Sequence, residues 1–235
     1  MAILGKIRYW FKNYWYYYKW PVIIIGFFVA VIVFCVVQSG DREEYDATIL
    51  YTGPYIFEPG QKDTLAMSMS QIMSGDYNED GEKNIGIIEM PAFTDEQINE
   101  LVGETGEIAD YVRYAPYTIE EVETQFAQQV FAGQAVLCLV DEYWYNLLRE
   151  GDGLLPLEEA LGYRPEGLRD AYSVDFHSLP FASFFEVAGR LPEGTILCFR
   201  KMSTASGFTG KAAAEKNYEN SKQLLRDLFA FEIPA

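Results

Sequence analysis

The stretch AVLCLVDEYWYNLLREG, residues 135–151, predicts a buried strand that leads directly into a helix. Its first six residues are continuously apolar, which is typical of a strand covered on both faces in a parallel sheet. The residues from Asp141 onward have a helical pattern, and this helix is expected to stop at Gly151. A strand followed by a helix is the repeating unit of α/β folds.

Similar patterns occur along the rest of the chain beyond residue 45. Strands are expected in DATILYTGPY (46–55), IGIIEM (85–90) and GTILCFRKMS (194–203), and the irregular stretch 171–187 could supply an edge strand. Helices are expected in 63–74 and 217–231 and after two capping boxes, Thr94 with Gln97 and Thr118 with Glu121. This alternation predicts one α/β domain over residues 46–235, with a mostly parallel sheet and right-handed crossovers.

The N-terminal part of the chain has a different character. PVIIIGFFVAVIVFCVV, residues 21–37, contains no charged side chain. As a helix it would extend roughly 26 Å, which is near the thickness of about 30 Å of a bilayer's hydrocarbon core. The aromatic and basic residues that precede it suit the headgroup layer: Tyr14, Trp15, Tyr16, Tyr17, Tyr18, Trp20, Lys6, Arg8, Lys12 and Lys19.

These features predict a single-pass protein of the cell membrane. Residues 1–20 would be cytoplasmic, 21–38 would be a transmembrane signal anchor in the lipid bilayer, and 39–45 a short stalk. The domain 46–235 would then be extracytoplasmic. Two alternatives are a signal peptide cleaved near Val37–Ser39 and lipidation of Cys35. The apolar run is long for a signal peptide, and Phe34 stands where a lipidated cysteine requires a small residue.

Charge restricts the partners of the domain. The part beyond residue 40 carries 35 acidic and 14 basic residues, a formal charge of −21. Phosphate backbones and anionic headgroups would repel such a surface, which argues against nucleic-acid binding. An acidic surface could attract cations or basic partners, although it is also the ordinary composition of a solvated face.

The three cysteines do not have the spacing of a disulfide framework or of a CxxC metal site. Cys35 lies in the apolar run, and Cys138 and Cys198 lie in two predicted strands. A bridge between the last two and a pair of buried free thiols both fit the sequence.

The loop DYNEDGEKN, residues 76–84, has several oxygen-bearing side chains at the spacing of a calcium loop. The candidate ligands are Asp76, Asn78, Asp80, Glu82 and Asn84. Gly81 fits the sharp turn of such a loop, but Ile87 stands where a bidentate glutamate is expected. Without a metal, the same residues would form an Asx turn between a helix and a strand. Calcium is the only cofactor that the sequence suggests.

A ligand site is predicted at the carboxyl edge of the sheet, where open α/β sheets bind their ligands. Its candidate residues are Tyr51, Thr52, Tyr55, Asp141, Glu142, Tyr143 and Trp144, with Ser203 and Thr204 from the last strand. Aromatic and acidic groups gathered there would suit a small organic or cationic solute. Alternatively, Tyr143 and Trp144 are helix residues that pack on the sheet or the membrane surface.

No catalytic set stands out in the sequence. ASGFTGKA, residues 205–212, lacks the first glycine and the final Ser or Thr of a phosphate loop. His177 is the one histidine, and its surroundings offer no nucleophile at a recognisable spacing. We therefore expect a protein that is not an enzyme.

Two resemblances add to these expectations. The N-terminal YYKWPVIII and the loop GDYNEDGEKNIGIIEM resemble uncharacterised single-pass membrane proteins of clostridia-like Gram-positive bacteria. The stretch 131–162 is similar to a lobe of type 2 periplasmic (extracellular solute-binding) proteins, a likeness that covers residues 46–200. Such proteins have two lobes, and the 195 residues beyond residue 40 are too few for both.

The resemblance implies a periplasmic-binding-protein-like α/β domain. Its expected role is that of a membrane-anchored, non-catalytic, solute-binding-like module that captures a small solute. The alternative is a structural or assembly protein that binds another membrane or envelope protein, which the short stalk and the missing second lobe favour.

Overall fold

The computed structural model describes residues 2–40, 45–94, 96–99, 119–203 and 211–234, and in the first of these ranges it describes the side chains of 14–16 and 18–34. The chain divides into two units, Met1–Glu44 and Tyr45–Ala235. The capping residue Thr118 and the loop residue Thr204 lie outside the described residues.

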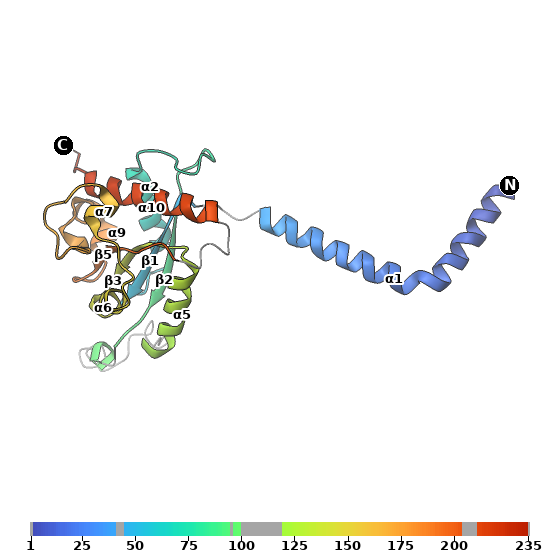
Figure 1. Ribbon diagram of the computed structural model, residues 1–235, viewed down its shortest axis with the longest axis horizontal. Helices are drawn as coiled ribbons and strands as arrows, with labels where there is room; N and C mark the ends of the chain where they lie inside the picture. Colours follow the sequence, from blue (N-terminus) through green and yellow to red (C-terminus); the bar gives the residue numbers. More distant parts are fainter. Residues whose placement is uncertain (1, 41–44, 95, 100–118, 204–210, 235) are drawn as a thin grey trace. The chain divides into compact units, whose positions relative to one another are not determined.

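The described residues of the first unit form one long helix, α1 (Ala2–Gly40), which contains Pro21. Figure 1 draws this helix with a bend, and proline bends helices because it lacks the N–H for a backbone hydrogen bond. Large apolar side chains from Val22 to Phe34 are exposed. Where side chains are described, no helix is both long and apolar enough to cross a membrane. The predicted span, residues 21–38, continues past Phe34 into residues whose side chains are not described, and it stays a prediction.

The described residues of the second unit form an α/β domain with a single open sheet of five strands in the order β2-β1-β3-β5-β4. The strands are β1 (Ala47–Gly53), β2 (Ile85–Pro91), β3 (Leu137–Val140), β4 (Ser173–Asp175) and β5 (Ile196–Phe199). The stretch 171–187 supplies an edge strand, as expected. Strands β1, β2 and β3 are parallel to one another.

The expectation of a mostly parallel sheet needs a correction, because the sheet is mixed. Strand β5 is antiparallel to both of its neighbours, with Val140 and Asp175 each opposite Ile196. The chain leaves β4 through the short helices η1 (Phe176–Ser178), α8 (Pro180–Phe184) and α9 (Glu186–Gly189). It then enters β5 at the edge where β4 ended, so β5 runs in the opposite direction.

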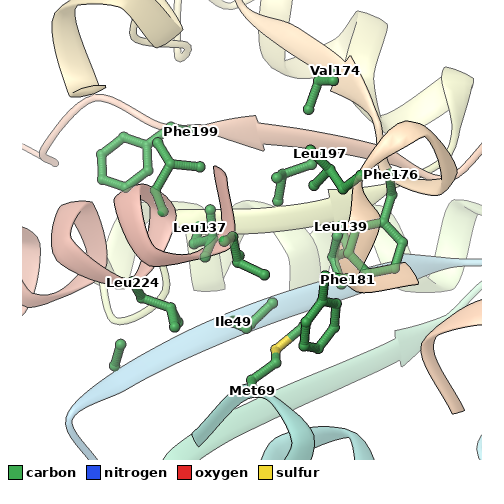
Figure 2. Close-up of a cluster of buried hydrophobic side chains, with 14 of the residues drawn as sticks. Ile49, Met69, Leu137, Leu139, Val174, Phe176, Phe181, Leu197, Phe199 and Leu224 are labelled. Atoms are coloured by element: carbon green, nitrogen blue, oxygen red, sulfur yellow. The ribbon is translucent and has the colours of Figure 1, made fainter. Parts of the chain in front are cut away.

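Apolar side chains on the two faces of the sheet form two separate cores. Leu137 and Leu139 belong to the first core and Cys138 and Val140 to the second. Successive side chains of a strand point to opposite faces, which is why β3 reads as an unbroken apolar run. The first core, shown in Figure 2, also includes Met69, Phe181 and Leu224.

Helices cover both faces of the sheet. The first core takes residues from α2 (Gln61–Ile72), α7 (Leu157–Leu161), α8 and α10 (Lys211–Ala230), and the second from α5 (Ile119–Ala132) and α6 (Glu142–Glu150). In Figure 1 the long α10 lies beside α2, and it also contacts β1 and β3. The open sheet therefore has an apolar layer on each face, as a doubly covered α/β domain requires.

Asp46 fixes the start of the domain just before β1. It is fully buried, and its carboxylate accepts hydrogen bonds from the backbone N–H groups of Tyr77 (2.6 Å), Asn78 (2.8 Å) and Asn84 (2.9 Å). Asn84 also accepts a bond from the backbone N–H of Asp46 at 3.1 Å. One carboxylate thus ties the loop before β2 to the beginning of β1.

Cys138 and Cys198 lie directly opposite each other on β3 and β5, and both are buried and free. Of the two possibilities that the sequence left open, the structure has the free thiols. They belong to the second core, where a buried thiol behaves as a small apolar side chain.

Candidate functional site

A pocket of about 540 Å³ lies at the edge of the sheet where β1 and β3 end. It is lined by Tyr51, Pro54, Thr94, Gln97, Asp141, Glu142, Tyr143, Asn146, Arg169, Pro192, Glu193, Gly194 and Thr195. Four of the predicted residues, Tyr51, Asp141, Glu142 and Tyr143, are among them. The structure therefore brings these four together at the edge of the sheet that the sequence indicated.

Tyr51 forms the inner wall of this pocket. Its side chain is 1% exposed, and its hydroxyl has no hydrogen-bond partner among the described residues. Its ring packs edge-on against the rings of Phe57 and Tyr55, with centroids 5.2 and 6.4 Å away. A buried polar group without a partner is uncommon in folded proteins and requires a reason.

The side chains of Tyr51 and Asp141 both lie close to Gly53. A Cβ atom added at Gly53 would lie 3.2 Å from the Tyr51 hydroxyl and 3.6 Å from Cβ of Asp141. Burial, followed by the charge of Asp141, raises the pKa of Tyr51 well above its ordinary value. The phenol is therefore neutral at physiological pH, and its oxygen can both donate and accept a hydrogen bond.

Asp141 is held at the junction between β3 and α6. Its carboxylate caps α6 by accepting a hydrogen bond from the backbone N–H of Trp144 at 3.2 Å, and its own N–H donates to the carbonyl of Thr52. Burial is the main reason why the pKa of Asp141 is raised. A short carboxylate side chain is well suited to a helix N-cap, and here the cap also places the carboxylate in the pocket wall.

Within the described lining, the rim of the pocket carries an ion pair between Arg169 and Glu142. Arg169 donates to the carboxylate of Glu142, and its guanidinium lies 5.8 Å from the centroid of the Tyr145 ring. The hydroxyl of Tyr143 donates to Glu123 on α5. Arg169 is thus tied to a carboxylate of the pocket itself.

The direction of β5 explains which rim residues the sequence analysis missed. Since β5 is antiparallel to β3, its first residues lie at the edge where β1 and β3 end, and Pro192–Thr195 line the pocket. Ser203, placed at this rim by assuming a parallel strand, instead follows β5 at the opposite edge. There its hydroxyl donates to the carbonyl of Phe131 at 2.8 Å. That prediction was wrong.

Thr94 and Gln97 also line the pocket, and the predicted capping box between them is confirmed. The N–H of Thr94 donates to the Gln97 side chain at 2.8 Å, and the N–H of Gln97 donates to the Thr94 hydroxyl at 3.1 Å. The sequence revealed the cap but not that it lies against β1 and α6. Only the tertiary fold supplies that information.

The other predicted ligand residues do not line this pocket. Trp144 is fully buried and packs against Phe126, with ring centroids 4.6 Å apart, as the packing alternative proposed. Thr52 is fully buried in β1. Tyr55 accepts a hydrogen bond from Gln61 and lines a neighbouring pocket of about 510 Å³ formed with Phe57 and Phe93.

A further pocket of about 560 Å³ lies between α2 and α9. Several of its polar side chains already have partners: Arg190 donates to Glu186 at 2.6 Å, and Gln61 donates to Tyr55 and accepts the N–H of Glu58. Its volume is similar to that of the Tyr51 pocket, but its described lining contains no buried side-chain polar atom that lacks a partner.

The proposed calcium loop forms a network of Asx turns. The Asp76 carboxylate accepts the N–H groups of Glu79 and Gly81, both at 2.7 Å, and Asp80 accepts the N–H of Glu82 at 2.9 Å. These bonds, led by the one from Gly81, lower the pKa of Asp76. Asn78 accepts the N–H of Asp80 at 2.9 Å.

The oxygens of this loop face backbone amides, as the turn alternative requires. Among the residues that the structure describes, no group of three or more His, Cys, Asp or Glu side chains is arranged to hold a metal ion. Calcium binding by Asp76, Asn78, Asp80, Glu82 and Asn84 stays an untested prediction.

His177 has a packing role. Its Nε2 atom lies 2.9 Å from the carbonyl oxygen of Leu191 and 3.1 Å from that of Pro192, so a proton on Nε2 can be donated to them. The imidazole thereby supports the turn before β5, which leads into the pocket rim.

Comparison of the chain with protein families, with characterised proteins and with solved structures gave no significant match.

Proposed function

We propose that this protein is a membrane-anchored, extracytoplasmic, non-catalytic module that captures a small solute in the Tyr51 pocket. The observation that carries the proposal is Tyr51, which lines the pocket and whose buried hydroxyl has no described partner. A bound solute would supply the missing hydrogen bond. The position of the pocket beyond the carboxyl ends of parallel strands is also where open α/β sheets bind ligands.

Binding of a solute is expected to raise the melting temperature of the full-length protein in detergent. A ligand present at 100 times its Kd adds about 2.7 kcal/mol to the free energy of unfolding. A thermal-shift panel of sugars, amino acids, short peptides and amines would measure this effect.

The matched variants for this experiment are two substitutions on α6. Asn146→Trp places a large side chain in the pocket wall, whereas Leu147→Trp changes the next residue, which is exposed and is not part of the lining. A shift that Asn146→Trp abolishes and Leu147→Trp preserves would support the pocket. If no compound shifts the melting temperature, the solute-binding role is wrong and the alternative role in envelope assembly gains weight.

The anchoring part of the proposal is supported by α1, which has 39 residues and exposes apolar side chains between Pro21 and Phe34. We expect protease added to intact cells to digest the acidic domain, and alkaline carbonate to leave the full-length chain in the membrane pellet. A domain that survives the protease, or a chain that carbonate releases, would contradict this topology.

A further inference from the structure

The charge of the Tyr51 pocket indicates what kind of solute it accepts. Three carboxylates line it, Asp141, Glu142 and Glu193, and Arg169 is the only basic side chain among the described lining residues. Arg169 is paired with Glu142. The remaining two carboxylates give the pocket an excess of negative charge without a counter-ion from its own described lining.

The side chains of Tyr51 and Asp141 are neighbours in the pocket wall. The Tyr51 hydroxyl and Cβ of Asp141 lie 3.2 and 3.6 Å from where a Cβ of Gly53 would be, and the charge of Asp141 helps to raise the pKa of Tyr51. A neutral phenol oxygen can accept a hydrogen bond, and a carboxylate can only accept when it is ionised. A group that donates several hydrogen bonds and carries positive charge would therefore satisfy both.

The ammonium group of an amine has three N–H donors and a full positive charge. A divalent metal ion fits less well, because calcium takes six to eight oxygen ligands and magnesium needs a near-ideal octahedron. The formal charge of −21 beyond residue 40 would also raise the local concentration of cations around the domain.

We infer that the Tyr51 pocket takes a small organic amine, whose ammonium group donates hydrogen bonds to the Asp141 carboxylate and the Tyr51 hydroxyl. This inference rests on the proposed function and adds the chemical class of the solute. The pocket volume of about 540 Å³ is within the range of small-molecule sites.

Three probes with four carbon atoms each test the chemical class of the solute. They are 1,4-diaminobutane, 1,4-butanediol and succinate, which are cationic, neutral and anionic. Calorimetric titration of the full-length protein in detergent at 0.15 M salt is expected to detect binding of the diamine alone. The salt screens nonspecific attraction to the acidic surface.

Two conservative variants test the contacts. Asp141→Asn keeps a side-chain oxygen for the α6 cap but removes the charge, and Tyr51→Phe removes only the hydroxyl. Since a hydrogen bond to a charged group contributes about 1.5–3 kcal/mol, each variant should weaken diamine binding roughly 10- to 100-fold. Glu150→Gln, an exposed site on α6 outside the lining, removes the same charge and should change the Kd less than about 2-fold.

The outcomes separate this inference from the proposed function. Equal weakening by Glu150→Gln and Asp141→Asn would mean nonspecific attraction and would overturn the inference. Binding of succinate, butanediol, calcium or a sugar in place of the diamine, lost in Asn146→Trp, would overturn the amine class and leave the solute-binding role intact. Unchanged melting temperatures of Asp141→Asn and Tyr51→Phe without ligand would show that lost binding is not lost folding.

Discussion

Replacing Phe181 by alanine is expected to lower the free energy of unfolding by about 3–5 kcal/mol, the usual cost of emptying a buried phenylalanine site. Phe181 is fully buried in the first core, and its ring contacts those of Phe185 and Phe176, with centroids 4.8 and 6.2 Å away. Figure 2 shows it next to Met69. Urea denaturation followed by circular dichroism would measure the loss.

Phe184→Ala is the matched control, three residues further along the same short helix. Phe184 is 45% exposed, so its removal should cost less than about 1.5 kcal/mol. Equal losses for the two variants would show that α8 does not dock on the sheet as described.

Replacing Asp46 by alanine should lower the free energy of unfolding by roughly 2–4 kcal/mol, because three backbone N–H groups lose their acceptor and each unsatisfied group costs about 1–3 kcal/mol when buried. These N–H groups are partly buried, so water would offset part of the loss. Asp46→Asn should cost less than alanine. Its remaining oxygen can keep the bonds from Tyr77 and Asn78, while its NH₂ group faces the N–H of Asn84.

Asp80→Ala provides the comparison for Asp46. Asp80 is exposed and accepts one backbone bond, from Glu82, so its loss should stay below about 1 kcal/mol. In the same denaturation experiment, the loss of free energy of unfolding should be largest for Asp46→Ala, smaller for Asp46→Asn and smallest for Asp80→Ala. Any other order would argue against the role of the Asp46 carboxylate in holding the loop before β2 against the start of β1.

Strands β1 and β3 could be predicted from the sequence because they are covered on both faces, whereas the edge strand β2 is only partly buried. In β3 the four residues Leu137–Val140 alternate between two cores, so the run is apolar throughout. A strand exposed on one face would have alternated with polar residues. The Thr94 cap could be predicted for a different reason: its two partners, Thr94 and Gln97, are only three residues apart in the sequence.

The direction of β5 could not be predicted, because an apolar run carries no information on the orientation of its neighbours. The short helices α8 and α9 were also missed, since five and four residues are too few to show a helical period. Both omissions bear on the candidate site. The half of its rim formed by Pro192–Thr195 depends on them, whereas Tyr51, Asp141 and Tyr143 follow from the strand ends alone.

The Asp46 carboxylate accepts hydrogen bonds from Tyr77, Asn78 and Asn84 at the point where the chain enters β1. Strand β1 is an interior strand of the sheet. Any tension transmitted along the chain from its N-terminal side would load β1 lengthwise, against the ladders of β2 on one flank and β3 on the other. Rows of hydrogen bonds pulled in this direction share the force and must break together. An edge strand pulled in the same direction would be held by one ladder instead of two, so this attachment resists a lengthwise pull better than an attachment at the edge of the sheet would.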